Sequence, residues 1–366
     1  MSSEQSSKYV DPWQEYRAIA GKLKKRVRFM RKPNLSEASR EFVSLAHRLS
    51  DDEQCANYAA LCQLAAARCE QQNGNHLGEH AGLKHAARLF MHIEQQRERD
   101  GFPGFHENLA AAIHCYCHAV RTHLEAKQFA LAGCVCLELA TNLVKIDRTS
   151  EACEYFEKAA RYLDTEPVSK THALWCLAEC HADADRPHEA LAAIDELWAL
   201  LTKLDGAHSS TASATGSSLT NQRPASSASS TATWRTRMLR DVEIAVVLLL
   251  LHMRSSPQHM SERHATLYAQ YSQVQLPTAV TNNSTATAQS ATPPSSQNVA
   301  SNNSELNEED FLLLQSLVIA VQWREPQMAD RAVTELMARI RPLHSMLALD
   351  VLERLYTEQY DMDECA

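Results

Sequence analysis

Apolar residues recur along this chain at the spacing of an α-helix, and one short polar phrase recurs between them. The phrase Asp-Arg-Thr-Ser-Glu-Ala occupies residues 147–152, and Asp-Arg-Pro-His-Glu-Ala occupies residues 185–190. An alanine- and cysteine-rich helix is predicted before each copy, at 131–144 and 171–181. After each copy, small and bulky apolar residues line one helix face. They are Ala152, Tyr155, Phe156, Ala159 and Leu163 after the first copy, and Ala190, Ile194, Leu197 and Leu201 after the second.

Helix–turn–helix units with a period in the thirties are typical of tetratricopeptide-like arrays. Residues 126–204 are therefore predicted to form a degenerate solenoid of helical hairpins. Alanine at a helix crossing lets two helices approach closely, and a larger side chain one turn later fills the groove. Thr149 or Ser150 is predicted to cap the helix after the first phrase, and Pro187 suits a first helical turn.

The same periodicity predicts helices over most of the remaining chain. No run of alternating apolar and polar residues is long enough for a sheet, and the chain holds only nine glycines. One helix is expected to begin near Asp11 and Pro12, and another after the cap Asn307. The fold class is therefore all-α, a tetratricopeptide-like helical-hairpin solenoid. Further helices are predicted at about 34–50, 53–72, 78–98, 106–125, 234–253, 261–271, 326–340 and 343–359.

Two segments rich in Ser, Thr, Ala and Asn interrupt this pattern. Residues 206–233 and 273–305 hold too few bulky apolar side chains to offset the entropy of ordering them, so both are predicted to be disordered insertions. They divide the rest of the chain into an N-terminal helical-repeat array, a helical pair that continues the array, and C-terminal helices. These three parts cover residues 1–205, 234–272 and 306–360.

Basic residues concentrate near the start of an otherwise acidic chain. The net charge is −9, but residues 1–40 carry ten Lys or Arg and four Asp or Glu, which leaves −15 for the remainder. The basic run is interpreted as a solvated helix end, a docking segment for an acidic protein surface, or a signal for nuclear import or RNA. No RNA-binding signature accompanies it, so nucleic acid is not predicted as a partner. The candidate partner-binding cations are Lys22, Lys24, Lys25, Arg26, Arg28, Arg31 and Lys32.

Two strongly apolar stretches, 244–251 and 311–319, flank the predicted insertions. Either they form the core of the C-terminal half, or a partner buries part of them, because obligate interfaces are large and apolar. Both fall far short of the roughly 18 residues of a membrane span, so no membrane insertion is predicted. Without an apolar signal segment, the chain is expected in the cytoplasm. The candidates for partner contact in the second stretch are Phe311, Leu314, Leu317 and Val318.

The sequence lacks the motifs of common catalytic and cofactor sites. It holds no glycine-rich phosphate loop, no His-Glu-x-x-His, no Cys-x-x-Cys and no strained nucleophile turn. Two clusters contain soft metal ligands, but both lie within predicted helices, where cysteine packs as a small hydrophobe. We therefore expect no enzyme activity, no cofactor and no metal. The clusters are His114, Cys115, Cys117 and His118, and His172, Cys176, Cys180 and His181.

Five sets of short segments occur in an order that resembles one family. They are Lys-Leu-Lys-Lys-Arg at 22–26 with 31–34; the pieces 58–60, 62–65 and 67–69; Ala-Ala-Arg-Leu-Phe at 86–90; Cys-Leu-Glu-Leu-Ala at 136–140; and Phe-Leu-Leu-Leu-Gln-Ser-Leu-Val at 311–318. Together with the chain length and a low-complexity insertion, they resemble the forty-kilodalton huntingtin-associated proteins, also called the coagulation factor VIII intron 22 protein family. The resemblance covers about 20–200 and 234–320, and the insertions here are rich in Ser, Thr and Asn instead of Pro.

The resemblance implies a helical solenoid that binds and stabilises huntingtin in a one-to-one complex, between the HEAT-repeat domains of huntingtin. It also implies a link, through huntingtin, to the Rab GTPase of early endosomes, with a location in the cytoplasm, on early endosomes and in the nucleus. A vesicle-fusion adaptor similar to the soluble NSF attachment proteins is the alternative hypothesis. A zinc-stabilised regulatory module is a third.

Overall fold

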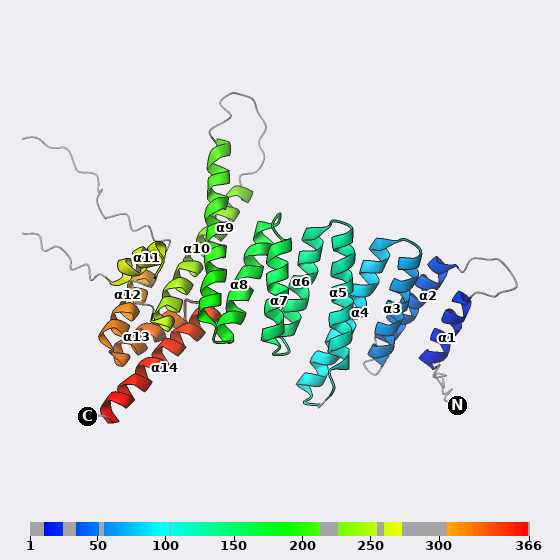
Figure 1. Cartoon of the computed structure of the whole chain (residues 1–366), viewed down its shortest axis with the longest axis horizontal. Helices are drawn as coiled ribbons and strands as arrows, with labels where there is room; N and C mark the ends of the chain where they lie inside the picture. The colour runs from blue at the N-terminus through cyan, green and yellow to red at the C-terminus, as the bar shows by residue number, and fades with distance from the viewer. Residues whose placement is uncertain are drawn as a thin grey trace, which may run out of the picture. The chain divides into compact units, whose positions relative to one another are not determined.

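The computed structural model describes residues 11–24, 34–50, 55–102, 104–212, 226–254, 260–272 and 306–364, and places fourteen α-helices and no strand in them (Figure 1). The chain forms two compact units, Met1–Ala184 and Asp185–Ala366. Within each unit, helices adjacent in sequence pack on one another, so the predicted all-α helical-repeat fold is confirmed. No helix in the described parts combines the length and apolar character needed to cross a lipid bilayer.

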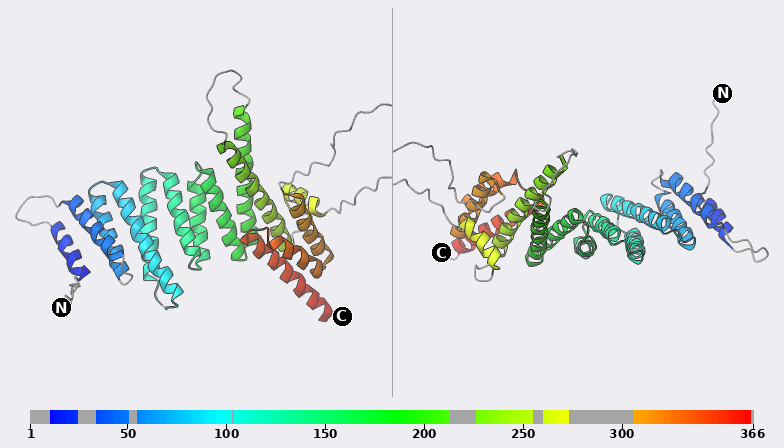
Figure 2. Two further views of the ribbon diagram at one scale, coloured as in Figure 1. Left: turned by 180° about the vertical axis from the view of Figure 1, so that it is seen from behind. Right: turned by 90° about the horizontal axis from the view of Figure 1, so that it is seen from above.

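The first unit is a succession of antiparallel helices that each contact the next, and Figure 2 shows them from two further sides. Alanines and cysteines fill the crossings: Ala59, Ala60, Ala86 and Ala87 are completely buried. Small side chains at these points let the helix axes approach closely. The helices are α1 (Pro12–Leu23), α2 (Leu35–Ser50), α3 (Ala56–Gln72), α4 (His76–Arg99), α5 (Glu107–Glu125), α6 (Phe129–Val144), α7 (Thr149–Tyr162) and α8 (Pro167–Asp183).

A polar brace joins three helices of this unit. Arg88 on α4 donates hydrogen bonds to both carboxylate oxygens of Glu138 on α6, at 2.5 and 2.7 Å, and the Tyr116 hydroxyl of α5 donates to Oε1 at 2.9 Å. Burial by itself would raise the pKa of Glu138, but the hydrogen bonds and charge of Arg88 and Tyr116 hold it below its ordinary value. Charge-assisted bonds of this kind are stronger than neutral ones, so they fix the register of α4, α5 and α6.

The second unit is built around one buried helix. All eight residues of 244–251 in α10 are buried, which agrees with the interpretation of this stretch as core. Helix α10 contacts α9 and α14, and more weakly α11 and α12. The helices are α9 (Pro187–Ala212), α10 (Ser226–Met253), α11 (Glu262–Ser272), α12 (Glu308–Trp323), α13 (Pro326–Met337) and α14 (Pro342–Glu364).

In both copies the repeated phrase begins in a turn and continues into the helix that follows, and the apolar stripes after it are buried except for the half-buried Tyr155. Asp147 and Asp185 both adopt the left-handed conformation, with φ of 58° and 52°. The predicted cap at Thr149 or Ser150 is wrong, because α7 already begins at Thr149. The cap position is held by Arg148, whose side chain donates to Glu151 and leaves the helix end without a side-chain cap.

Other helix starts agree with the sequence. Asp11 accepts from the Trp13 amide, Asn307 accepts from the Asp310 amide, and α9 begins at Pro187. Helices α9 and α10 extend into the range 206–233, which was predicted to be an insertion. Lengthening a helix that is already packed costs little compared with starting one. The rest of that range, 213–225, and the second predicted insertion, 273–305, lie outside the described residues.

Candidate partner-binding surfaces

The predicted basic segment is described only at its start. Lys25, Arg26, Arg28, Arg31 and Lys32 lie outside the residues that the structure describes. The Lys22 ammonium pairs with Glu41 of α2 at 2.5 Å, while Lys24 is exposed. A role of this segment in binding an acidic surface stays a prediction.

The candidate residues of α12 point mostly into the chain itself. Leu314, Leu317 and Val318 have no exposed surface, and the Phe311 ring lies 4.7 Å from the ring of Tyr271, measured between centroids. Contact of the four side chains with a partner stays a prediction, and for Leu314, Leu317 and Val318 it would require this part of the core to open. The exposed apolar residues on or near this helix are instead Leu312 and Trp323.

Neither cysteine–histidine cluster, each within the described residues, brings three of its ligand atoms close enough together to hold a metal ion. Cys176 lies 3.6 Å from His172, whereas His181 turns to Cys153, with Sγ and Nδ1 at 3.9 Å. In the other cluster Cys115 is buried, and burial raises the pKa of its thiol to about 11. Seven of the ten described cysteines are buried, as expected of small apolar side chains.

The loop between α4 and α5 carries the most exposed aromatic side chain of the described chain. Phe105 is 94% exposed and Phe102 is 67% exposed. Gly101 adopts a left-handed conformation at φ of 66°, and the Arg97 guanidinium occupies the place that a Cβ on Gly104 would take. Both phenylalanines lie in solvent. The signal that the sequence analysis missed is the pair of phenylalanines in a short segment that also holds Gly101, Pro103 and Gly104.

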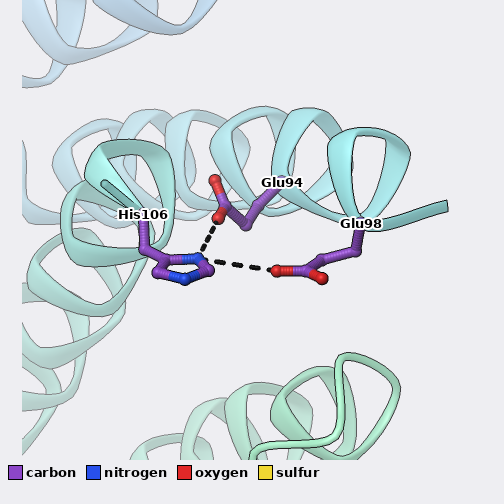
Figure 3. A group of neighbouring side chains, drawn as sticks. All are labelled: Glu94, Glu98 and His106. Atoms are coloured by element: carbon purple, nitrogen blue, oxygen red, sulfur yellow. Dashed lines mark hydrogen bonds and ion pairs between the residues drawn. The ribbon is translucent and has the colours of Figure 1, made fainter. Parts of the chain in front are cut away.

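Glu94 and Glu98 of α4 lie next to His106, which directly precedes α5 (Figure 3). His106, with φ of 54°, places its Nδ1 2.7 Å from Oε1 of the buried Glu94 and 3.5 Å from Oε1 of Glu98. Of the described residues, these three form the group whose ligand atoms lie close enough together to hold a metal ion. The short His106–Glu94 hydrogen bond already joins two of those atoms, so we interpret the group as a brace for the loop.

Half of the chain is similar to the 40-kDa huntingtin-associated protein. It is 41% identical to the protein of that name from rat over 194 residues, which are 52% of this chain and 50% of the rat protein. It is 44% identical to the mouse protein over 168 residues, 45% of this chain and 43% of the mouse protein. The chain thus spans about half the length of the curated relatives it matches. The predicted resemblance is confirmed, and no family model matches the chain.

Proposed function

We propose that this chain is a non-enzymatic helical adaptor that binds huntingtin in a one-to-one complex and stabilises it between its HEAT-repeat domains. The supporting observation is the 41–44% identity, over about half the chain, to relatives whose name states an association with huntingtin. The helical-repeat fold is compatible with this role, because such arrays offer extended surfaces to protein partners.

The surface of the first unit offers a specific place for such contact. Phe102 and Phe105 are exposed between α4 and α5, where Arg97 lies against Gly104 and His106 is bonded to Glu94. Exposed aromatic side chains are enriched among the residues that dominate interface energy. We infer that this loop contributes apolar contact, while the basic segment beginning at Lys22 contributes electrostatic attraction.

The proposal extends to cellular context. Through huntingtin, the chain would connect to the Rab GTPase of early endosomes, and it would occur in the cytoplasm, on early endosomes and in the nucleus. Pull-down of the Rab GTPase by this chain, with and without huntingtin, separates an indirect link from a direct one. Capture only in the presence of huntingtin is expected, and equal capture in its absence would contradict an indirect link.

Co-expression with huntingtin, followed by size-exclusion chromatography with light scattering, tests the main proposal. We expect a one-to-one complex that persists at high salt, since screening weakens exposed charge pairs far more than apolar contacts. Failure to co-elute would contradict the proposal. Stimulation of an NSF-type ATPase by the chain would then favour the vesicle-fusion adaptor.

A further inference from the structure

A small cavity lies at the packed helices α3, α4 and α5 of the first unit, which follow one another in Figure 1. Its volume is about 190 Å³, and both apolar and polar side chains line it. Such a volume holds several waters or one side chain of a binding partner, since a liquid water occupies about 30 Å³. The lining residues that matter here are Leu64, Ala67, Arg68, Glu79, Leu83 and His118.

Glu79 gives this cavity a buried negative group. Its side chain is 3% exposed, and Oε1 has no hydrogen-bond partner within the described chain. Two histidines lie near it: His118 Nε2 is 3.5 Å from Oε1 and His76 Nδ1 is 3.7 Å from Oε2, both beyond a good hydrogen bond. Glu79 lies in the first turn of α4. A buried acceptor without a donor is uncommon in native proteins and calls for an explanation.

The remaining walls suit an aliphatic chain. Leu64 and Ala67 come from α3, and Leu83 comes from α4. The two helices are unusually close at this point, because a Cβ added to Gly82 would lie 3.0 Å from the Cβ of Ala67. The cavity therefore combines a narrow apolar lining with one carboxylate that lacks a donor.

We propose that this cavity binds the side chain of a lysine from a protein partner. Lysine places a compact ammonium with three donors at the end of a four-carbon stem, and so matches both the carboxylate and the apolar walls. Arginine matches less well, because its planar fork prefers both oxygens of a carboxylate, and Oε2 of Glu79 faces His76. Arg68 is exposed beside the cavity, and its positive charge weakens the binding of an incoming ammonium.

A metal ion is the competing occupant. His114 and His118 stand one turn apart on α5 and line the cavity with Glu79. These three do not form a group with close ligand atoms, whereas Glu94, Glu98 and His106 do. The cavity thus has a carboxylate without the converging ligands that a transition metal requires.

Titration of the full chain with n-butylamine, followed by the imidazole signals in NMR spectra, tests this proposal. The amine carries the stem and ammonium of a lysine side chain, and n-butanol carries the same stem without the charge. We expect the amine to shift the His118 signal, and n-butanol to bind at least about tenfold more weakly. Glu79→Gln should weaken the binding of n-butylamine by about tenfold or more. Arg68→Gln should strengthen that binding.

Glu138→Gln is the matched control, because Glu138 is a partly buried carboxylate already paired within the same unit. It should leave amine binding unchanged. It should also lower the midpoint of thermal unfolding, whereas Glu79→Gln should leave that midpoint unchanged or raise it, since it removes a buried charge without a good partner.

Three outcomes would overturn the proposal. One is equal binding of n-butylamine and n-butanol by the chain. Another is unaltered amine binding after Glu79→Gln in a variant that remains folded. The third is a Zn²⁺-dependent shift of the His114 and His118 signals without a response to the amine, which would mark a metal site.

Discussion

The imidazole rings of His80 on α4 and His123 on α5 stack with their centroids 3.8 Å apart and their planes 15° from parallel. The Thr122 hydroxyl lies 2.7 Å from Nδ1 of His80, and Gln128 Oε1 lies 2.9 Å from Nδ1 of His123. Both histidines are buried. Two imidazoles are therefore packed against each other at the contact between α4 and α5.

Acidification should destabilise the first unit through His80. Burial, and then the imidazoles of His123, His76 and His118, lower the pKa of His80 to about 4 from its ordinary 6.5. Between these two values the unfolded chain binds a proton that the folded chain does not, so stability falls as the pH falls. We expect this effect, about 2 kcal/mol, to lower the midpoint of thermal unfolding by about 4–8 °C between pH 7 and pH 5. His80→Gln should lose that part of the decrease, and an unchanged pH profile would contradict the assignment.

Removal of Arg88 should weaken the brace between α4, α5 and α6. Arg88→Met leaves the Glu138 carboxylate with the Tyr116 hydroxyl as its remaining donor in the brace. We expect a loss of about 1–3 kcal/mol in the free energy of unfolding, measured by urea denaturation. Arg148→Met breaks an exposed pair with Glu151 and serves as the control, with an expected loss of at most about 0.5 kcal/mol. Equal losses in the two variants would show that the brace adds no stability.

The α4–α5 loop should contribute to huntingtin binding if the proposed function is correct. Replacing both Phe102 and Phe105 by Ser should weaken the complex by about tenfold or more, because exposed aromatic residues often dominate interface energy. Thermal unfolding of the free chain should be unaffected. Val168→Ser, which alters an apolar residue that is 61% exposed on α8, is the control. Unchanged affinity of the double variant, measured by surface plasmon resonance, would exclude the loop from the interface.

Charge reversal in the basic segment should affect association in a salt-dependent way. With Lys24, Lys25, Arg26 and Arg28 changed to Glu, the association rate with huntingtin should fall more at low salt than at high salt, because salt screens exposed charges. Lys145→Glu, an exposed lysine at the end of α6, provides the control. An equal loss at every salt concentration would argue against electrostatic attraction as the role of this segment.

The helices and much of the core could be predicted because they depend on local periodicity. The stripe from Ala190 to Leu201 and the apolar run 244–251 both identify buried faces without any knowledge of the neighbouring helices. Asn307 and Pro187 mark helix starts for equally local reasons. The cap at Thr149 failed because the turn before α7 is set by the left-handed Asp147 and by the pairing of Arg148 with Glu151, and neither has a distinctive sequence signal.

The candidate surfaces depended on tertiary placement and could not be predicted in the same way. Glu79 resembles any acidic residue in the first turn of a helix until α3 and α5 enclose it. Leu314 and Val318 were candidates for partner contact on apolar character alone, yet packing within the chain buries them. Conversely, nothing in the periodicity of the sequence distinguishes Phe102 and Phe105 from other apolar residues, and only the structure shows that both are exposed.

The burial of α10 has a consequence for how this chain is made on the ribosome. Its apolar residues 244–251 are covered partly by α14, which begins only at Pro342, about ninety residues later. At a synthesis rate of about 5–20 residues per second, this side of α10 lacks its cover for on the order of ten seconds. Helices of the first unit, by contrast, pack on neighbours that emerge directly before and after them. The chain therefore most needs a chaperone while its second unit is being synthesised.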